Sequence, residues 1–195
     1  MTRKVNAATL SHIKQFEGLR LQAYPDPGSK DGNPWTIGYG STSNVKKGMV
    51  IDHAEAEARL VRDLTHAETT VERLVSVPLT DNQFGALVSF VFNVGAGAFE
   101  KSTLLRHLNN GDYAAVPAQL SRWNKNDGAV MPGLTRRRAA EAVLWGTPSG
   151  TAPKPAPIPV EPLPERAKGK GAPIGIITTI IILAALAAAF FFVRF

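Results

Sequence analysis

The chain has 195 residues, which allows one ordinary domain with additional segments, and its formal net charge is +6. It contains no cysteine, which excludes a disulfide framework and thiolate catalysis. The four histidines are scattered without the spacing of metal ligands, so we expect them at surface or boundary positions, with no metal and no cofactor. A mildly basic protein is drawn to polyanions in general, but the sequence has no basic stripe interleaved with aromatic residues, which disfavours nucleic acid as a partner.

The N-terminal third is predicted to contain one short helix and a small sheet. Residues 7–17 are expected to be helical, because apolar residues recur there at three-residue spacing and Gly18 is placed to end the helix. In residues 19–44, glycine and proline are frequent and short β-prone pieces lie between turns. This composition predicts a small antiparallel sheet with loops.

A long helix is predicted next. The sequence from Asp52 to Glu55 is close to a capping box, and a helical stripe of apolar residues then runs to about Val75, with Pro78 shortly after it. A helix of that extent is about 35 Å long. It is therefore long enough to connect two lobes.

The rest of the domain is predicted to be helical. Thr80 and Gln83 form a second capping box ahead of an apolar face, and the glycines at 95 and 97 are expected to end that helix. Further helices are expected at 102–108, 113–122 and 136–145, separated by turns. The predicted fold class is therefore α+β and predominantly α, with the sheet near the N-terminus.

The last part of the chain has the composition of a linker followed by a membrane anchor. Residues 148–172 are rich in proline, glycine and lysine, which favours an extended spacer. Residues 173–193 are uncharged and almost wholly apolar, so they are long enough to cross a hydrocarbon core of roughly 30 Å as a helix; a buried core helix is the alternative. The basic residues just before this segment place the N-terminal domain in the cytoplasm by the positive-inside rule. The N-terminus is basic but lacks a following apolar run, so we expect no cleavable secretory signal.

Candidate residues for polysaccharide hydrolysis cluster around the predicted sheet. Such hydrolysis usually needs two carboxylates, one protonated as the acid and one ionised. Glu17 follows Phe16 at the end of the first predicted helix, where the helix dipole and partial burial disfavour a negative charge, as a general acid requires. Asp26 lies between two prolines and Thr36 lies in a β-prone piece. Taken singly, each has a plainer explanation: a solvated helix end, a turn residue and a strand position, respectively.

Taken together, these segments resemble glycoside hydrolase family 24, the phage-type lysozymes or endolysins. The matching segments are Phe16-Glu17-Gly18, Ala23-Tyr24-Pro25-Asp26 and Thr36-Ile37-Gly38-Tyr39-Gly40, followed by Asn93-Val94-Gly95, Gly133-Leu134, Arg137-Arg138 and Glu141. The resemblance covers roughly residues 10–147. It implies a lysozyme-like two-lobed fold: a small sheet-containing N-terminal lobe, a long connecting helix and a larger helical lobe, with the glycan strand in the cleft between the lobes.

The resemblance also implies roles for the matching residues. Glu17 would protonate the glycosidic oxygen, Asp26 would position or activate the attacking water, and Thr36 would help to hold that water and the sugar. The segment between Asp26 and Thr36 is longer than in the shortest family members, which makes Thr36 the least secure of the three and leaves Asp31 as a rival. Asn93 is expected near the cleft or in support of it, with a packing or solvated role left open.

The sequence thus predicts a lysozyme that cuts the β-1,4 bond between N-acetylmuramic acid and N-acetylglucosamine in peptidoglycan, for lysis of a bacterial host. Arg137 is expected near the cleft, with a packing or solvated role left open. The predicted organisation is a catalytic domain at 1–147, a Pro-rich linker at 148–172 and a transmembrane helix at 173–193. The domain would stay on the cytoplasmic side of the inner membrane until a holin-type pore, or its own C-terminal helix, opened the way to the periplasmic wall. The alternatives are a catalytically inactive, membrane-anchored wall-binding module and a tail-anchored module that binds a partner.

Overall fold

The computed structural model of the protein describes residues 3–25 and 33–148. Asp26, Asp31 and the predicted transmembrane segment 173–193 lie outside these residues, as does nearly all of the predicted linker. Within the described ranges, no helix combines the length and the apolar character that a membrane span needs.

The described chain forms seven α-helices, a short 3-10 helix and two two-stranded antiparallel sheets. The helices are α1 (Ala7–Glu17), α2 (His53–Leu74), α3 (Asp81–Val94), α4 (Ala96–Glu100), α5 (Thr103–Asn109), η1 (Tyr113–Ala115), α6 (Val116–Ser121) and α7 (Pro132–Gly146). The strands are β1 (Arg20–Tyr24), β2 (Thr36–Gly38), β3 (Lys125–Asn126) and β4 (Ala129–Val130). This architecture confirms the predicted α+β, mostly helical fold with a small sheet near the N-terminus.

The sheet of β1 and β2 follows α1 directly. The side chain of Asn6 caps the start of α1 by accepting from the Thr9 N–H at 2.9 Å, and the helix ends at Gly18, whose φ of 68° is open to glycine. The chain then enters β1, which pairs with β2 in a register that places Arg20 opposite Gly38 and Tyr24 opposite Thr36. The end of α1 is therefore followed directly by β1, and the pairing of the strands brings β2 to the same place.

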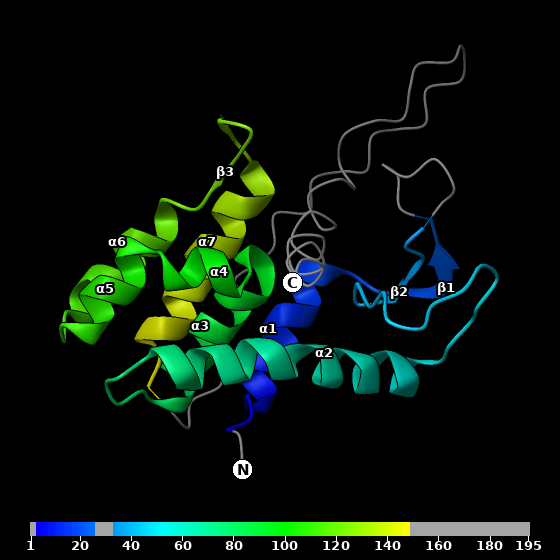
Figure 1. The fold of residues 1–195 in the computed structure, drawn as a ribbon, viewed down its shortest axis with the longest axis horizontal. Helices are drawn as coiled ribbons and strands as arrows, with labels where there is room; N and C mark the ends of the chain where they lie inside the picture. Colours follow the sequence, from blue (N-terminus) through cyan, green and yellow to red (C-terminus); the bar gives the residue numbers. More distant parts are fainter. Residues whose placement is uncertain (1–2, 26–32, 149–195) are drawn as a thin grey trace, which may run out of the picture.

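Helix α2 runs from beside this sheet to the helical lobe (Figure 1). Asp52 caps it by accepting from the Glu55 N–H at 2.8 Å, and its apolar residues form one buried face that includes Leu60, Leu64 and Val71. Its 22 residues correspond to a length of about 33 Å. The prediction of a long helix connecting two parts of the domain is confirmed.

Helix α3 lies at the centre of the helical lobe, where it packs against α1, α2, α4 and α7. The capping box of Thr80 and Gln83 is formed as predicted. Phe90 is fully buried and meets the rings of Phe99 and Trp123 edge-on, at centroid distances of 6.2 and 5.3 Å. This aromatic cluster fixes α4 and the end of α6 against α3.

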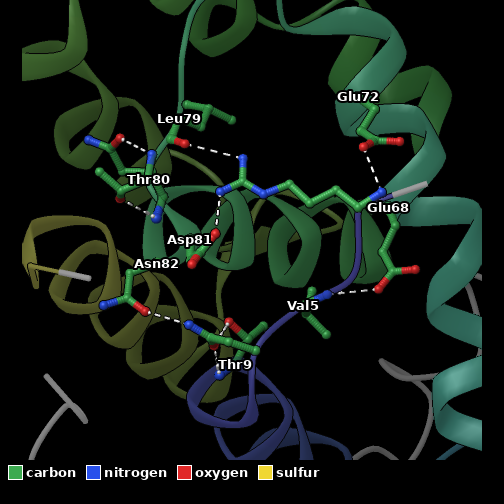
Figure 2. A network of polar contacts seen from close by, with 11 residues as sticks. Val5, Thr9, Glu68, Glu72, Leu79, Thr80, Asp81 and Asn82 are labelled. Atoms are coloured by element: carbon green, nitrogen blue, oxygen red, sulfur yellow. Dashed lines mark hydrogen bonds and ion pairs between the residues drawn. The ribbon is translucent and has the colours of Figure 1, made fainter. Parts of the chain in front are cut away.

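The N-terminal segment ties α1 to both α2 and α3 (Figure 2). Its contacts are the Arg3 N–H to Glu72 at 2.7 Å, the Val5 N–H to Glu68 at 3.0 Å, the Arg3 guanidinium to the Leu79 carbonyl and to Asp81, and Asn6 to Asn82 at 3.0 Å. Asn82 also donates to the carbonyls of Thr147 and Pro148 at 3.1 and 3.0 Å. The two ends of the described domain therefore meet at the start of α3.

Several sequence-based boundaries differ from the structure. Gly95 ends α3 as predicted, but Gly97 lies inside α4, a helix that the sequence did not predict. The helix predicted at 113–122 is divided into η1 and α6, and α7 begins at Pro132 because proline is favoured in a first helical turn. The turn predicted before α7 is a small hairpin, in which Asp127 and Gly128 both have positive φ.

Candidate active site

Glu17 is buried and paired although it stands at the end of a helix. Its side chain is 5% exposed, and its Oε1 accepts a hydrogen bond of 2.6 Å from Nη1 of Arg137 on α7. The plain explanation of Glu17 as a solvated helix end is therefore wrong. The packing of α7 against α1 brings these two residues together from positions 120 apart in the sequence.

The Arg137 guanidinium is held on all three of its nitrogens. Besides the bond from Nη1 to Glu17, its Nη2 donates to the Ser89 carbonyl at 3.3 Å, and its Nε donates to Oε1 of Glu141 at 3.4 Å. A planar guanidinium with three separate acceptors has one orientation that satisfies them all. Arg137 is therefore a fixed, buried positive charge beside the candidate acid, and of the alternatives left open for it, the solvated role is excluded.

A second ion pair completes the charge cluster between α3 and α7. Nη2 of Arg138 and the hydroxyl of Ser89 both donate to Oε1 of Glu141 at 2.8 Å. Arg138 also lies over the ring of Phe90, 4.9 Å from its centroid. Burial raises the pKa of Glu141, and the two guanidiniums oppose that shift. Glu17, Glu141 and the two arginines together form a cluster of two carboxyls and two guanidiniums.

His12 lies on the α1 side of this cluster. It is 9% exposed, which corrects the expectation of a surface or boundary histidine, and its ring is 5.1 Å from that of Phe16. The Phe16 ring in turn faces the Arg137 guanidinium at 5.7 Å. Burial, together with the charges of Arg137 and Arg138, lowers the pKa of His12 to about 4. His12 is therefore neutral near pH 7 and adds no charge to the cluster.

Thr36 is the predicted site residue on the sheet. It is 2% exposed, and its hydroxyl has no hydrogen-bond partner among the described residues. A buried hydroxyl without a partner is costly, which indicates a site for a partner that the described residues do not supply. The plain strand explanation accounts for its backbone but leaves this hydroxyl unexplained.

The strand that carries Thr36 is fixed to α2 through the loop that follows it. Ile37 and Ser41 exchange two backbone hydrogen bonds of 2.9 Å, and the Ser41 hydroxyl donates to Asp63 of α2 at 2.5 Å. The Cβ position of Gly38 is only 3.5 Å from Ala56. The long helix thus positions β2 as well as the helical lobe.

The structure therefore places some of the predicted site residues and leaves others undescribed. Glu17 and Arg137 are brought into contact, and Thr36 lies on the strand paired with β1, whereas Asp26 and its rival Asp31 lie outside the described residues. Asn93 stands in the last turn of α3, partly buried. Ser89 and Glu141 were not predicted as site residues. Glu141 follows Arg137 and Arg138 by one helical turn, which is the spacing of ion pairs on a helix and was the available signal.

This arrangement suits proton transfer by a carboxyl group. A buried carboxyl beside one oriented cation can change its protonation state without rearrangement of its surroundings. In Glu17 the carboxyl is 5% exposed and has one fixed guanidinium partner, the geometry that this chemistry needs.

Comparisons with known proteins show which family this chain is similar to. Residues 14–141 match the profile of the family described as Phage lysozyme. The chain is 42% identical over 137 residues to an endolysin of Acyrthosiphon pisum secondary endosymbiont phage 1, covering 68% of this chain and 91% of the relative. It is 38% identical over 134 residues to a SAR-endolysin of bacteriophage PS119, covering 67% and 78%. Among solved structures, the muramidase domain of SpmX from Asticaccaulis excentricus is similar, with a TM-score of 0.69, 40% identity and coverage of 75% of this chain and 99% of that one.

Proposed function

We propose a catalytic assignment and a cellular route for this chain, which belongs to the phage lysozyme family and is a lysozyme-type hydrolase of the bacterial cell wall. The bond cut is the β-1,4 linkage between N-acetylmuramic acid and N-acetylglucosamine in peptidoglycan. The alternative of an inactive wall-binding module is disfavoured, because similarity to endolysins and to a muramidase extends over about two thirds or more of the chain.

Glu17 is the general acid of this proposal. The observation that carries it is the buried Glu17 side chain, held by Arg137 at the end of α1 where the sheet begins. In this role, Glu17 gives its proton to the glycosidic oxygen as the bond to the anomeric carbon breaks, and Arg137 stabilises the carboxylate that remains. Arg137 is a positioning residue, since it acts through Glu17.

Asp26 and Thr36 hold the attacking water in this proposal. Support for Thr36 comes from its buried hydroxyl, which lacks a partner among the described residues. Support for Asp26 comes from its position two residues after Tyr24, whose Cα pairs with that of Thr36. An ionised Asp26 would accept a proton from the water as the water attacks the anomeric carbon.

Parallel substitutions distinguish Asp26 from its rival. Asp26→Asn is expected to lower the rate of reducing-end formation on purified peptidoglycan by about 100-fold or more, because general-base catalysis is lost. Asp31→Asn, its matched control, should retain nearly full activity. Loss of activity in Asp31→Asn alone would transfer the role to Asp31. Thr36→Val should lower the rate about tenfold and Thr36→Ser should restore it, since only serine keeps the hydroxyl.

We propose further that residues 173–193 anchor the chain in the inner membrane, with the catalytic domain on the cytoplasmic side until lysis. The support is the uncharged apolar composition of the segment and the basic residues that precede it. A relative that carries the name SAR-endolysin also points toward a membrane-tethered form. A breach of the membrane, by a holin-type pore or by the chain's own C-terminal helix, would then admit the domain to the periplasmic wall.

Protease protection tests this orientation. In intact spheroplasts, the catalytic domain of the full chain should resist added protease, and permeabilisation of the membrane should expose it. Cleavage before permeabilisation would show that the domain lies outside. Recovery of the full chain in the soluble fraction after lysis without detergent would show that it has no anchor.

A further inference from the structure

Glu141 is a completely buried carboxylate that the proposed mechanism does not use. Its exposed fraction is 0%, and its Oε1 accepts from Ser89, Arg138 and Arg137. A buried ion cluster is costly, and apolar side chains of similar volume would often stabilise the fold as well or better. The contacts of Glu141 therefore call for an explanation beyond stability.

The contact with Arg137 links Glu141 to the candidate acid. Arg137 gives Nη1 to Glu17 and Nε to Glu141, so two carboxylates share one guanidinium. Ser89 fixes both partners, because its hydroxyl donates to Glu141 and its carbonyl accepts from Arg137. A shift of the Glu141 carboxylate would therefore change the orientation in which Arg137 meets Glu17.

We propose that Glu141 is a positioning residue for the hydrolysis: by sharing Arg137 with Glu17, it fixes the guanidinium against the Glu17 carboxyl and sets an opposite charge beside it. The proposal rests on the assignment of Glu17 as the general acid. Among the described residues, the ionisable groups joined in this cluster are His12 and Glu17 from α1, and Arg137, Arg138 and Glu141 from α7; α3 contributes the uncharged Ser89. With His12 neutral, these described groups comprise two carboxyls and two guanidiniums.

Removing one charge should shift the pH at which the acid loses its proton. Glu141→Gln keeps the shape of the side chain but removes the negative charge that Arg137 and Arg138 share, so the charge of the cluster near Glu17 becomes more positive. The alkaline limb of kcat/KM should move to lower pH by about half a unit or more. Arg138→Gln removes a positive charge, so that Arg137 is the one guanidinium still bonded to Glu141. The alkaline limb should then move to higher pH. A loss of packing alone would not produce shifts of opposite sign.

A third and a fourth variant keep the proposal testable if Glu141→Gln fails to fold. Glu141→Gln combined with Arg138→Gln restores the balance of charge, so its alkaline limb should return toward that of the wild type. Ser89→Ala changes no charge in the cluster; it should lower stability or rate and move the limb by less than about 0.2 pH unit.

The experiment is the pH dependence of kcat/KM for reducing-end formation on purified, lipid-free peptidoglycan, using the full chain in mild detergent. Opposite shifts in the two single variants, or a shift in Arg138→Gln that the double variant reverses, support the proposal. Limbs that coincide with the wild type in every folded variant would overturn it and leave Glu141 a structural role. Glu17→Gln tests the underlying assignment separately, because undiminished activity in that variant would remove Glu17 as the acid whatever the limbs show.

Discussion

Nη1 of Arg137 lies 2.6 Å from Oε1 of Glu17, and this contact joins the last turn of α1 to α7 across 120 residues of chain. Both side chains are 5% exposed, so the pair is screened little by solvent. One contact therefore holds α7 against α1 and fixes the residue proposed here as the general acid.

Replacing Arg137 should cost both stability and activity. Arg137→Ala leaves Glu17 and Glu141 buried without their common partner, which is expected to lower the free energy of unfolding by about 3–5 kcal/mol. Arg137→Lys keeps a charge but cannot reach three acceptors at once, so it should retain more stability than the alanine variant with a reduced rate. Denaturant unfolding followed by circular dichroism measures the first effect, and reducing-end formation measures the second. Arg136→Ala is the matched control: Arg136 is exposed, so its loss should change stability by less than about 0.5 kcal/mol.

His12 should make the fold less stable in mild acid. Its pKa lies near 4 in the folded protein and 6.5 is its ordinary value, so between these values the unfolded chain binds more protons than the native one. Above about pH 6.5, His12 is neutral in both states and this contribution to the free energy of unfolding is fully present. As the pH falls from 6.5 toward 4, the contribution is lost, by about 1–3 kcal/mol in total. His12→Gln should lose less stability than the wild type between pH 7 and pH 4.5, whereas His66→Gln, at an exposed position, should follow the wild type. Identical pH profiles for His12→Gln and the wild type would show that His12 is not the titrating group.

Gly85 marks the closest approach of α1 and α3. A Cβ at this position would lie 1.9 Å from the hydroxyl oxygen and 2.9 Å from the Cβ of Thr9, so Gly85→Ala should destabilise the fold by about 1–3 kcal/mol. Adding Thr9→Ala should recover part of that loss, because it removes the nearer atom and leaves the Cβ. Gly97→Ala in α4 meets nothing within 4 Å and should be neutral or stabilising. Thermal unfolding of these three variants and of Thr9→Ala alone tests the contact, and additive effects of the alanines at 9 and 85 would argue against it.

The elements with strong local signals were predictable from the sequence. Asn6 and Gly18 bound α1, Asp52 starts α2, and the capping box of Thr80 starts α3, because each of these signals acts within a few residues of the helix end. The start of α6 within 113–122 has a local signal in Pro117, which lies in its first turn, whereas α4 packs against α3 and has no side-chain cap to mark it.

In the candidate site, too, some features were predictable from short segments of sequence and others arise only from packing. Glu17 and Thr36 were identified by a resemblance of short segments, and the structure adds that both are buried. The partnership of Glu17 with Arg137 arises only when α7 packs on α1, so no local spacing predicts it. Glu141 follows Arg137 and Arg138 at the spacing of helical ion pairs. Its contact with Arg137 also depends on Ser89 from α3, which is hydrogen-bonded to both residues.

The most direct test of the account is reducing-end formation from purified, lipid-free peptidoglycan by the full chain, wild type beside Glu17→Gln. Glu100→Gln, which changes an exposed glutamate, serves as the matched control. The account predicts that the wild type and Glu100→Gln release reducing ends at similar rates, while Glu17→Gln is folded but slower by about 100-fold or more. Comparable rates in folded Glu17→Gln and wild type would contradict the assignment of Glu17 as the general acid.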